Sequence, residues 1–212
     1  MTNFFKYLFF PISAVLLISS FLVFLVPISV LALPFKWQTR RTITGPFWWA
    51  FAHFSLRIVC LARITKIDRR EGNIGSVGCP EGLYIANHQS YLDIPMMLTN
   101  LQSPPVMKKE VLYIPILGLC AYSSGSIIVD RKDVNSRKKV LKTATERLTS
   151  FDKSLQFYPE GTRQKKPTGP KEITEIKKPL IQVAYNNGIK VFPISIYGTR
   201  NVLNEKTGLV NY

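Results

Sequence analysis

Residues Asn87 to Asp93 place a histidine and an aspartate, His88 and Asp93, five positions apart. The apolar run at residues 83–86 predicts a buried strand, and the apolar positions between 92 and 98 predict a short helix. His88 is therefore expected where a strand ends and a helix begins, which is where α/β sheets collect ligands. The chemistry that these residue types suggest is acid–base catalysis, with the imidazole as the proton acceptor.

The spacing decides how His88 and Asp93 can meet. Within one helix, residues five apart point about 140° away from each other, so both residues cannot be helical. If Ser90 is the N-cap, Asp93 takes the third helical position and its carboxylate reaches back to the turn that carries His88. A carboxylate bound to one imidazole nitrogen fixes the tautomer and raises the basicity of the other nitrogen. The pair then forms the base half of an acyl-transfer site with no nucleophile of its own.

A second interpretation of the same heptapeptide is structural. Ser90 and Asp93 also have the spacing of a capping box, in which case His88 is a loop histidine bound to the backbone. The heptapeptide alone leaves both interpretations open. The other histidine, His53, lies among aromatic residues with no polar partner nearby in the sequence, so we interpret it as an interfacial residue.

Strands and helices are expected to alternate through the rest of the chain. Ser136 is expected to cap a helix that runs to Phe151, and a further helix is expected near residues 173–186, where Asn187 and Gly188 end it. This alternation predicts an α/β fold with a mostly parallel central sheet flanked by helices. The expected strands are residues 83–86, 105–107, 126–129, 155–158 and 191–197, after a strand and turns within 65–82.

Charged groups follow three of the predicted strands, and the ends of parallel strands meet at one edge of a sheet. Arg131 and Arg163 can bind a phosphate with two parallel hydrogen bonds, and Lys108 or Lys109 can add a point charge. Gly161 allows a ligand to approach the backbone closely, and the Thr162 hydroxyl lies beside it. Each group alone could be a solvated loop residue. Together they predict an anion pocket beside a general base.

The N-terminal part of the chain has the composition of a membrane anchor. The net charge of the whole chain is +15, and residues 1–67 contain no Asp or Glu. Residues 7–35 carry no charged side chain, but Pro11 and Pro27 interrupt them. This segment is expected to be either a kinked spanning helix or an anchor in one leaflet. If it spans, the Lys and Arg excess after it places the catalytic domain on the cytoplasmic face.

A second apolar helix is expected to start at Gly45-Pro46, with Trp48 and Trp49 at its membrane interface. We therefore predict a two-helix membrane-anchoring segment at residues 1–64 and an α/β domain at residues 65–212. Basic residues interleaved with Trp and Phe favour an anionic bilayer surface as the partner. Nucleic acid fits poorly, because no nucleic-acid motif accompanies the charge. Three cysteines without a Cys/His cluster predict neither a disulfide framework nor a zinc site, and indicate a reducing compartment.

Five segments carry a resemblance to a known family. Residues 87–93 resemble the His-x4-Asp box of the glycerolipid acyltransferases, and residues 125–131, 158–163 and 191–194 resemble their second, third and fourth motifs. Residues 108–118 are similar to the lysine segment of the lysophosphatidate acyltransferase (PlsC-like) branch. The resemblance covers roughly residues 80–200, in the order of the family. It implies transfer of a fatty acyl group from acyl-CoA or acyl carrier protein to the sn-2 hydroxyl of lysophosphatidate, which gives phosphatidate.

The resemblance also implies roles for the residues. His88 is the base and Asp93 orients it, while Arg163, with Lys108 or Lys109, holds the acceptor phosphate and Arg131 supplements that field. Glu160 is expected to organise the pocket by pairing with a basic residue, next to Gly161 and Thr162. Neither a metal nor a cofactor is expected beyond the acyl-CoA or acyl carrier protein co-substrate. The membrane lipid is the expected partner, because the acceptor and product both carry acyl chains.

The sequence departs from the family pattern at two places. Tyr158 stands where phenylalanine is usual, and residues 175–179 stand where a glycine-containing turn is common. Family members also commonly continue beyond the fourth motif, so either a short variant or a truncated chain is expected. Three alternatives are a sister acyltransferase that uses glycerol-3-phosphate or another lysolipid, a His/Asp hydrolase, and a non-enzymatic adaptor on anionic membranes. The hydrolase is disfavoured because no Gly-x-Ser-x-Gly elbow is present.

Overall fold

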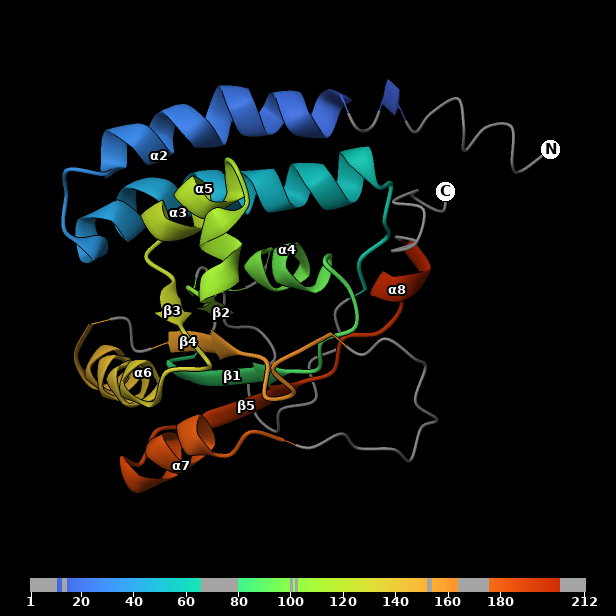
Figure 1. The fold of residues 1–212 in the computed structure, drawn as a ribbon. Helices are drawn as coiled ribbons and strands as arrows, with labels where there is room; N and C mark the ends of the chain where they lie inside the picture. The colour runs from blue at the N-terminus through green and yellow to red at the C-terminus, as the bar shows by residue number, and fades with distance from the viewer. Residues whose placement is uncertain are drawn as a thin grey trace.

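The fold is described from a computed structural model, which covers residues 11–12, 15–65, 80–99, 101, 103–151, 154–163 and 176–202. Figure 1 shows a layered arrangement in which two long N-terminal helices lie side by side above α4. The strands lie below these helices, and α6 and α7 cover the opposite face of the sheet. This confirms the predicted α/β class with helices on both faces of the sheet.

Every strand pairing in the described residues is parallel. Three strands, β1 (Gly82–Ala86), β4 (Ser154–Phe157) and β5 (Val191–Ile194), form a sheet in the order β4-β1-β5. Two more strands, β2 (Val106–Lys108) and β3 (Ile127–Val129), pair with each other. A single bridge between Pro105 and Gln156 joins the two sheets. The strand β1, which leads to His88, is therefore the central strand of its sheet.

The two faces of β1 pack against different helices because successive side chains alternate along a strand. Leu83 belongs to a core cluster with α6 (Val134–Glu146) and α7 (Pro179–Asn186), including Val140 and Ala184. Tyr84 points to the other face, where it packs with Met97 of α4 (Asp93–Leu98). Burial on both faces is what a near-continuous apolar strand in a parallel sheet requires.

The first long helix runs through Val15–Ala32 and includes the π-helical turn η1 (Phe21–Leu25) and α2 (Val26–Ala32). The prediction that Pro27 interrupts this helix is wrong. Pro27 falls in the first turn of α2, which follows the π turn. A proline at that position loses no hydrogen bond that the new turn needs. The 18-residue window has a mean hydropathy of 2.7, and only 22% of it is buried. By length and composition it is able to cross a membrane.

The second long helix, α3 (Trp37–Phe54), begins well before Gly45-Pro46, so the predicted start was wrong. Pro46 lies inside the helix, where a missing N–H and a ring clash cost about 3 kcal/mol. Contacts with the first helix offset that cost. The Phe21 ring packs edge-on against Phe51 and Trp48, with ring centroids 4.3 and 6.2 Å apart. The helix then ends through a π-helical turn, η2 (Ser55–Val59).

The N-terminal helices are joined to the rest of the protein by buried polar contacts. Ser123, at the end of α5 (Leu117–Ser123), donates a hydrogen bond of 2.8 Å to Ser29 of α2. Arg147 lies with its guanidinium carbon 3.8 Å from the centre of the Trp37 ring and donates to the Gly125 carbonyl. Burial, with the nearby positive charges of two arginines, lowers the pKa of Arg147 to about 10. The apolar helices are therefore packed onto the α/β layer.

Several predicted boundaries differ from those in the structure. The cap of α6 is Asp133, which accepts a hydrogen bond from the Asn135 N–H at 2.8 Å, and not Ser136. Ser136 instead accepts from the Asp130 N–H at 3.0 Å. The helix α7 starts only at Pro179, β5 ends at Ile194, and residues 195–197 are not a strand. Elements not predicted are η3 (Lys109–Tyr113), α5 and α8 (Thr199–Val202), whereas η4 (Arg147–Phe151) continues α6 to the predicted end of that helix at Phe151. Most of the strand and turns predicted at 65–82 lies outside the described residues.

Candidate active site

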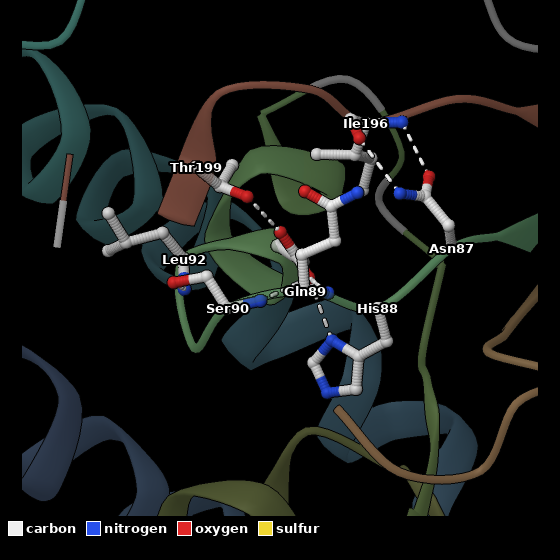
Figure 2. Close-up of polar contacts among 8 residues, drawn as sticks. Asn87, His88, Gln89, Ser90, Leu92, Ile196 and Thr199 are labelled. Carbon is white, nitrogen blue, oxygen red and sulfur yellow. Dashed lines mark hydrogen bonds and ion pairs between the residues drawn. The ribbon is translucent and has the colours of Figure 1, made fainter. Parts of the chain in front are cut away.

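The end of β1 is fixed by a pair of hydrogen bonds between Asn87 and Ile196 (Figure 2). The Asn87 amide donates to the Ile196 carbonyl at 2.8 Å, and its oxygen accepts from the Ile196 N–H at 2.7 Å. These two bonds continue the pairing of β1 with β5 beyond its last register pair, Ala86 with Ile194. His88 is therefore presented from a backbone that is held on the next strand.

His88 and Asp93 make the contact that their spacing predicts. The His88 Nδ1 atom lies 2.8 Å from Asp93 Oδ2, and Asp93 is completely buried while the His88 side chain is 15% exposed. The same oxygen accepts from the backbone N–H groups of Gln89 at 2.5 Å and Ser90 at 2.8 Å. The carboxylate thus stabilises the turn and also binds the imidazole. The catalytic and the capping interpretations of the heptapeptide are therefore compatible.

The predicted helix start at this turn needs one correction. Regular helix begins at Asp93 itself, with Leu92 as the preceding residue, so Asp93 is the first helical residue and not the third. Ser90 Oγ accepts a hydrogen bond of 3.3 Å from the Leu92 N–H. The turn between Ser90 and Asp93 is closed by the bond from the Asp93 N–H to the Ser90 carbonyl. It is this turn, rather than a full helical turn, that brings the carboxylate to His88.

The environment keeps Asp93 ionised. Burial raises the pKa of Asp93, but hydrogen bonds from His88, Ser90, Thr199 and Gln89 together lower it by a larger amount. The pKa of Asp93 therefore lies below its ordinary value. An ionised carboxylate can only accept, so the His88 Nδ1 carries the proton. The Nε2 atom, on the far side of the ring from Asp93, then has a free lone pair (Figure 2). This is the arrangement of a general base.

Tyr158 covers the imidazole. Its ring lies 4.5 Å from the ring of His88, with the planes tilted by 32°, and it is 7% exposed. Burial and the charge of Asp93 raise its pKa well above the ordinary value, so the phenol stays neutral. Its hydroxyl has no hydrogen-bond partner among the described residues. The aromatic ring at this position therefore acts as a wall that holds the imidazole in place.

A cavity of about 1450 Å³ opens in front of His88 and extends from the ends of the strands to the N-terminal helices. Asp93 lies behind His88, and neither Lys109 nor Glu160 is among the residues that line this cavity. Toward the N-terminal helices the lining is mostly apolar and includes Leu17, Phe21 and Trp48, with Arg41 as a charged residue among them. The predicted site residues that line it are His88, Lys108, Arg131, Gly161, Thr162 and Arg163.

Lys108 and Lys109, which the sequence left as equal candidates for the phosphate, lie in different environments. Lys109 Nζ pairs with Asp130 Oδ2 at 3.3 Å, on an exposed surface, whereas Lys108 lines the cavity. Arg137 also lines the cavity, although no sequence pattern distinguishes it from the other basic residues of α6. The anion end of the cavity is therefore formed by Lys108 and arginines from different segments.

Two contacts shape the anion end. The guanidinium carbon of Arg163 lies 3.5 Å from the centre of the Tyr91 ring, which is a cation–π contact. Gly161 has φ +71°, and a Cβ there would lie 2.6 Å from Lys177 Nζ. The positive φ favours glycine at this position, whereas the flexible end of the Lys177 side chain is able to move aside. Lys177 belongs to the segment that departs from the family pattern, and its N–H donates to the Pro159 carbonyl at 2.9 Å.

One contact to the His88–Asp93 pair is not predictable from the sequence. Thr199 Oγ donates to Asp93 Oδ1 at 2.6 Å, and the two residues are 106 positions apart. Nothing in the composition around Thr199 distinguishes it from other buried threonines. Tyr91 lies inside the heptapeptide, and only its aromatic type hinted at a contact with a cation.

Comparison with known proteins agrees with this fold. The family model described as Acyltransferase matches residues 75–197. A chloroplastic 1-acyl-sn-glycerol-3-phosphate acyltransferase of Arabidopsis thaliana is 30% identical over 196 residues, which are 89% of this chain and 52% of that protein. The 1-acyl-sn-glycerol-3-phosphate acyltransferase of Escherichia coli (strain K12) is 29% identical over 160 residues, 73% of this chain and 61% of that protein.

A solved structure also resembles the whole chain. The crystal structure of the 1-acyl-sn-glycerophosphate acyltransferase PlsC from Thermotoga maritima matches with a TM-score of 0.69 and 19% identity, over 100% of this chain and 82% of that chain. At this identity the likeness supports the fold. Because the family model matches more than half of the sequence, this protein belongs to the Acyltransferase family. The chain spans about half the length of the curated relatives named above.

Proposed function

We propose that this protein transfers a fatty acyl group from an acyl thioester, acyl-CoA or acyl carrier protein, to the sn-2 hydroxyl of lysophosphatidate, which gives phosphatidate. The observation that carries the proposal is the buried His88–Asp93 pair at the wall of a cavity with one cationic end and one apolar end. A lysophosphatidate molecule has the same division between a phosphate and an acyl chain. The relatives from Arabidopsis thaliana and Escherichia coli are named 1-acyl-sn-glycerol-3-phosphate acyltransferases.

The chemistry needs only groups that the site supplies. His88 Nε2 takes the proton of the acceptor hydroxyl as its oxygen attacks the thioester carbonyl carbon, and the carbonyl becomes a tetrahedral oxyanion. Asp93 stabilises the imidazolium that forms, through the proton on Nδ1. The intermediate collapses with loss of the thiolate, which takes the proton from His88 Nε2. The products are the new oxygen ester and the free thiol, and His88 returns to its neutral state.

The cationic end suits the acceptor phosphate. Arg163 is our main candidate ligand, because its guanidinium is held on the Tyr91 ring next to the His88 turn. Lys108 and Arg131 line the same cavity and add to the field. Lys109 pairs with Asp130, and Glu160 is outside the cavity lining, so their proposed roles are indirect. Glu160 is half-buried beside Gly161 and is proposed to organise the turn.

The apolar end suits acyl chains and a membrane. Exposed apolar side chains continue along the first helix, including Val23, Phe24 and Leu31, which are 59 to 67% exposed. Figure 1 shows this helix lying along α3 and across the α/β layer. We therefore propose that residues 1–64 anchor the protein in one leaflet of an anionic bilayer, and that residues 65–212 form the acyltransferase domain. If the first helix instead spans the bilayer, the Lys and Arg excess that follows it places the acyltransferase domain on the cytoplasmic face.

The test follows free-thiol release from acyl-CoA, and from acyl carrier protein, with and without lysophosphatidate. Wild-type protein is expected to release thiol only with the acceptor, and His88→Ala is expected to abolish this release while leaving membrane association intact. His53→Ala is the matched control, because His53 packs on Trp49 at 4.3 Å and is not among the cavity-lining residues. Full activity of His88→Ala would refute the mechanism.

The same assay separates the alternatives. Release without acceptor would indicate a hydrolase, and no release under any condition would indicate a non-enzymatic adaptor. Replacing lysophosphatidate by glycerol-3-phosphate or by other lysophospholipids identifies a sister acyltransferase. A clear preference for one of those acceptors over lysophosphatidate would contradict the proposed substrate and leave the base chemistry standing.

A further inference from the structure

The two oxygens of the Asp93 carboxylate are held in different ways. Oδ2 accepts from His88 and from two backbone N–H groups within the same turn. Oδ1 accepts from the hydroxyl of Thr199 at 2.6 Å, and no other described residue donates to it. Because Asp93 is completely buried, water does not replace a missing donor at this oxygen. The Thr199 hydroxyl is thus the group that completes the hydrogen bonding of the carboxylate.

Thr199 reaches this place on a segment that is fixed at both ends. Ile196 is bound to Asn87 by two hydrogen bonds, and Gly198, at φ +86°, turns the chain into α8. The Asn201 N–H then donates to the Gly198 carbonyl at 2.9 Å, which closes the turn that carries Thr199. Thr199 itself is 2% exposed. Figure 2 shows it directed at the carboxylate from the side opposite to His88.

We propose that Thr199 is a positioning residue of the His88–Asp93 pair, which acts by fixing the second carboxylate oxygen. This inference deepens the proposed function and rests on it for its kinetic test. Thr199 lies beyond residues 75–197, which are the residues that the family model matches. With donors on both oxygens, the carboxylate plane cannot rotate, so Oδ2 stays on the Nδ1–H of His88. Without the Thr199 hydroxyl, Oδ1 has no donor, and only the hydrogen bonds to Oδ2 restrain the carboxylate.

Loss of the hydroxyl has a second effect on the pair. The hydrogen bond from Thr199 stabilises the carboxylate most when His88 is neutral, because no imidazolium then shares the negative charge. Removing the donor therefore destabilises the neutral-imidazole state more than the imidazolium state, and the pair takes up a proton more readily. The other groups near the pair are Tyr158, packed on the ring, and the cations that line the cavity, which are Arg41, Lys108, Arg131, Arg137, Arg163, Lys177 and Lys178. None of them is altered by a change at Thr199.

The experiment compares Thr199→Val, which removes the hydroxyl and keeps the shape, with Thr199→Ser, which restores a hydroxyl. Thr99→Val is the matched control, because Thr99 is also buried, at 8% exposed, and its hydroxyl bonds the Met96 carbonyl instead. All are full-length chains, assayed by acceptor-dependent thiol release across a range of pH. Thr199→Val is expected to lower kcat about tenfold with little change in KM, because the loss of orientation at His88 outweighs the gain in basicity of the pair; a tenfold loss corresponds to about 1.4 kcal/mol.

The acid limb of the pH–rate profile of Thr199→Val is expected to move to higher pH. Thr199→Ser and Thr99→Val are expected to stay within about twofold of wild type, well inside the tenfold effect of one lost charged hydrogen bond. Wild-type kinetics in Thr199→Val would overturn the inference. Equal losses in Thr199→Ser, or in Thr99→Val, would also overturn it, because they would indicate a general packing defect.

A measurement independent of turnover separates this inference from the proposed function. The ring of His88 is titrated by NMR in histidine-labelled full-length protein, with His53→Gln used to assign the two histidine signals. Thr199→Val is expected to raise the pKa of the His88 ring, and Thr199→Ser is expected to leave it as in wild type. If wild type shows no acceptor-dependent thiol release, the proposed function fails, and this titration alone decides the role of Thr199. Identical titrations in Thr199→Val and wild type would overturn it.

Discussion

Replacing Asp93 by asparagine removes the negative charge of the His88 partner and keeps its shape. The asparagine carbonyl oxygen can accept the three N–H donors that now converge on Oδ2, from His88, Gln89 and Ser90. Its amide NH2 then faces the Thr199 oxygen, which can accept. The His88 tautomer is therefore preserved, and the turn keeps its hydrogen bonds. What changes is the electrostatic stabilisation of the imidazolium.

The size of that effect follows from the geometry. The His88 Nδ1 and Asp93 Oδ2 atoms are 2.8 Å apart, so the centres of the two charges lie about 4 Å apart in the imidazolium state. At that separation, and at an effective dielectric constant of about 20, the attraction amounts to about 4 kcal/mol. A factor of ten in rate corresponds to about 1.4 kcal/mol, so Asp93→Asn is expected to lower kcat about a thousandfold. This lies within the usual range for loss of a general base.

The assay is acceptor-dependent thiol release at saturating acyl thioester and lysophosphatidate, with thermal unfolding measured on the same samples. Asp133→Asn is the matched control, because Asp133 caps α6 on the surface and asparagine caps a helix about as well as aspartate. Asp133→Asn is expected to be fully active. A loss of less than about tenfold in a correctly folded Asp93→Asn protein would refute a role for the Asp93 charge in stabilising the imidazolium, since about 4 kcal/mol predicts far more.

Three further outcomes are expected. Tyr91→Leu should raise the acceptor KM a few fold, because it removes the ring whose centre lies 3.5 Å from the Arg163 guanidinium carbon. Tyr91→Phe keeps the ring and should keep the KM of wild type. Equal KM values in the two variants would contradict a role of the Tyr91 ring in acceptor binding. Lys108→Ala should raise the acceptor KM more than Lys109→Ala, because only Lys108 lines the cavity, and the reverse order would contradict the assignment. The folded-state pKa of Asp93 lies below its unfolded value, so the carboxylate stabilises the fold above the unfolded pKa, and that contribution is lost as the pH falls through the folded pKa. Chemical denaturation should therefore show that wild type loses more unfolding free energy on acidification than Asp93→Asn, and parallel pH curves would contradict this.

The sequence predicted the parts of the fold that depend on local patterns. The five strands of the described residues lie where short apolar runs were found. In β1, burial of successive residues leaves a continuous apolar signature. The contact between His88 and Asp93 was also predictable, since five residues of chain limit where the two side chains can go. Local geometry was sufficient for the base and its partner.

The errors came where tertiary contacts override local preference. A proline at position 46 predicts a helix start, but packing of Phe21 against Phe51 stabilises a helix that contains it. Ser136 is a good capping residue by type, yet Asp133 caps the helix and Ser136 binds the backbone of Asp130. In both cases several residues satisfy the same local rule, and the choice among them depends on neighbours distant in the sequence.

The remaining features of the site follow from strand order, which the sequence did not specify. Because the order is β4-β1-β5, the chain beyond the end of β1 has two neighbours, and each supplies one group to the dyad. The continuation of β4 supplies Tyr158, whose ring packs on His88, and the continuation of β5 supplies Thr199, which binds Asp93.

The base is thus encoded in seven consecutive residues, but its support comes from both adjacent strands. A change in the register of either pairing would move a supporting group while leaving the His-x4-Asp spacing intact. For this reason the heptapeptide is necessary for the proposed chemistry and is not sufficient for it. The test at Thr199 measures the contribution of the β5 side, and replacing Tyr158 by leucine or phenylalanine would measure that of the β4 side.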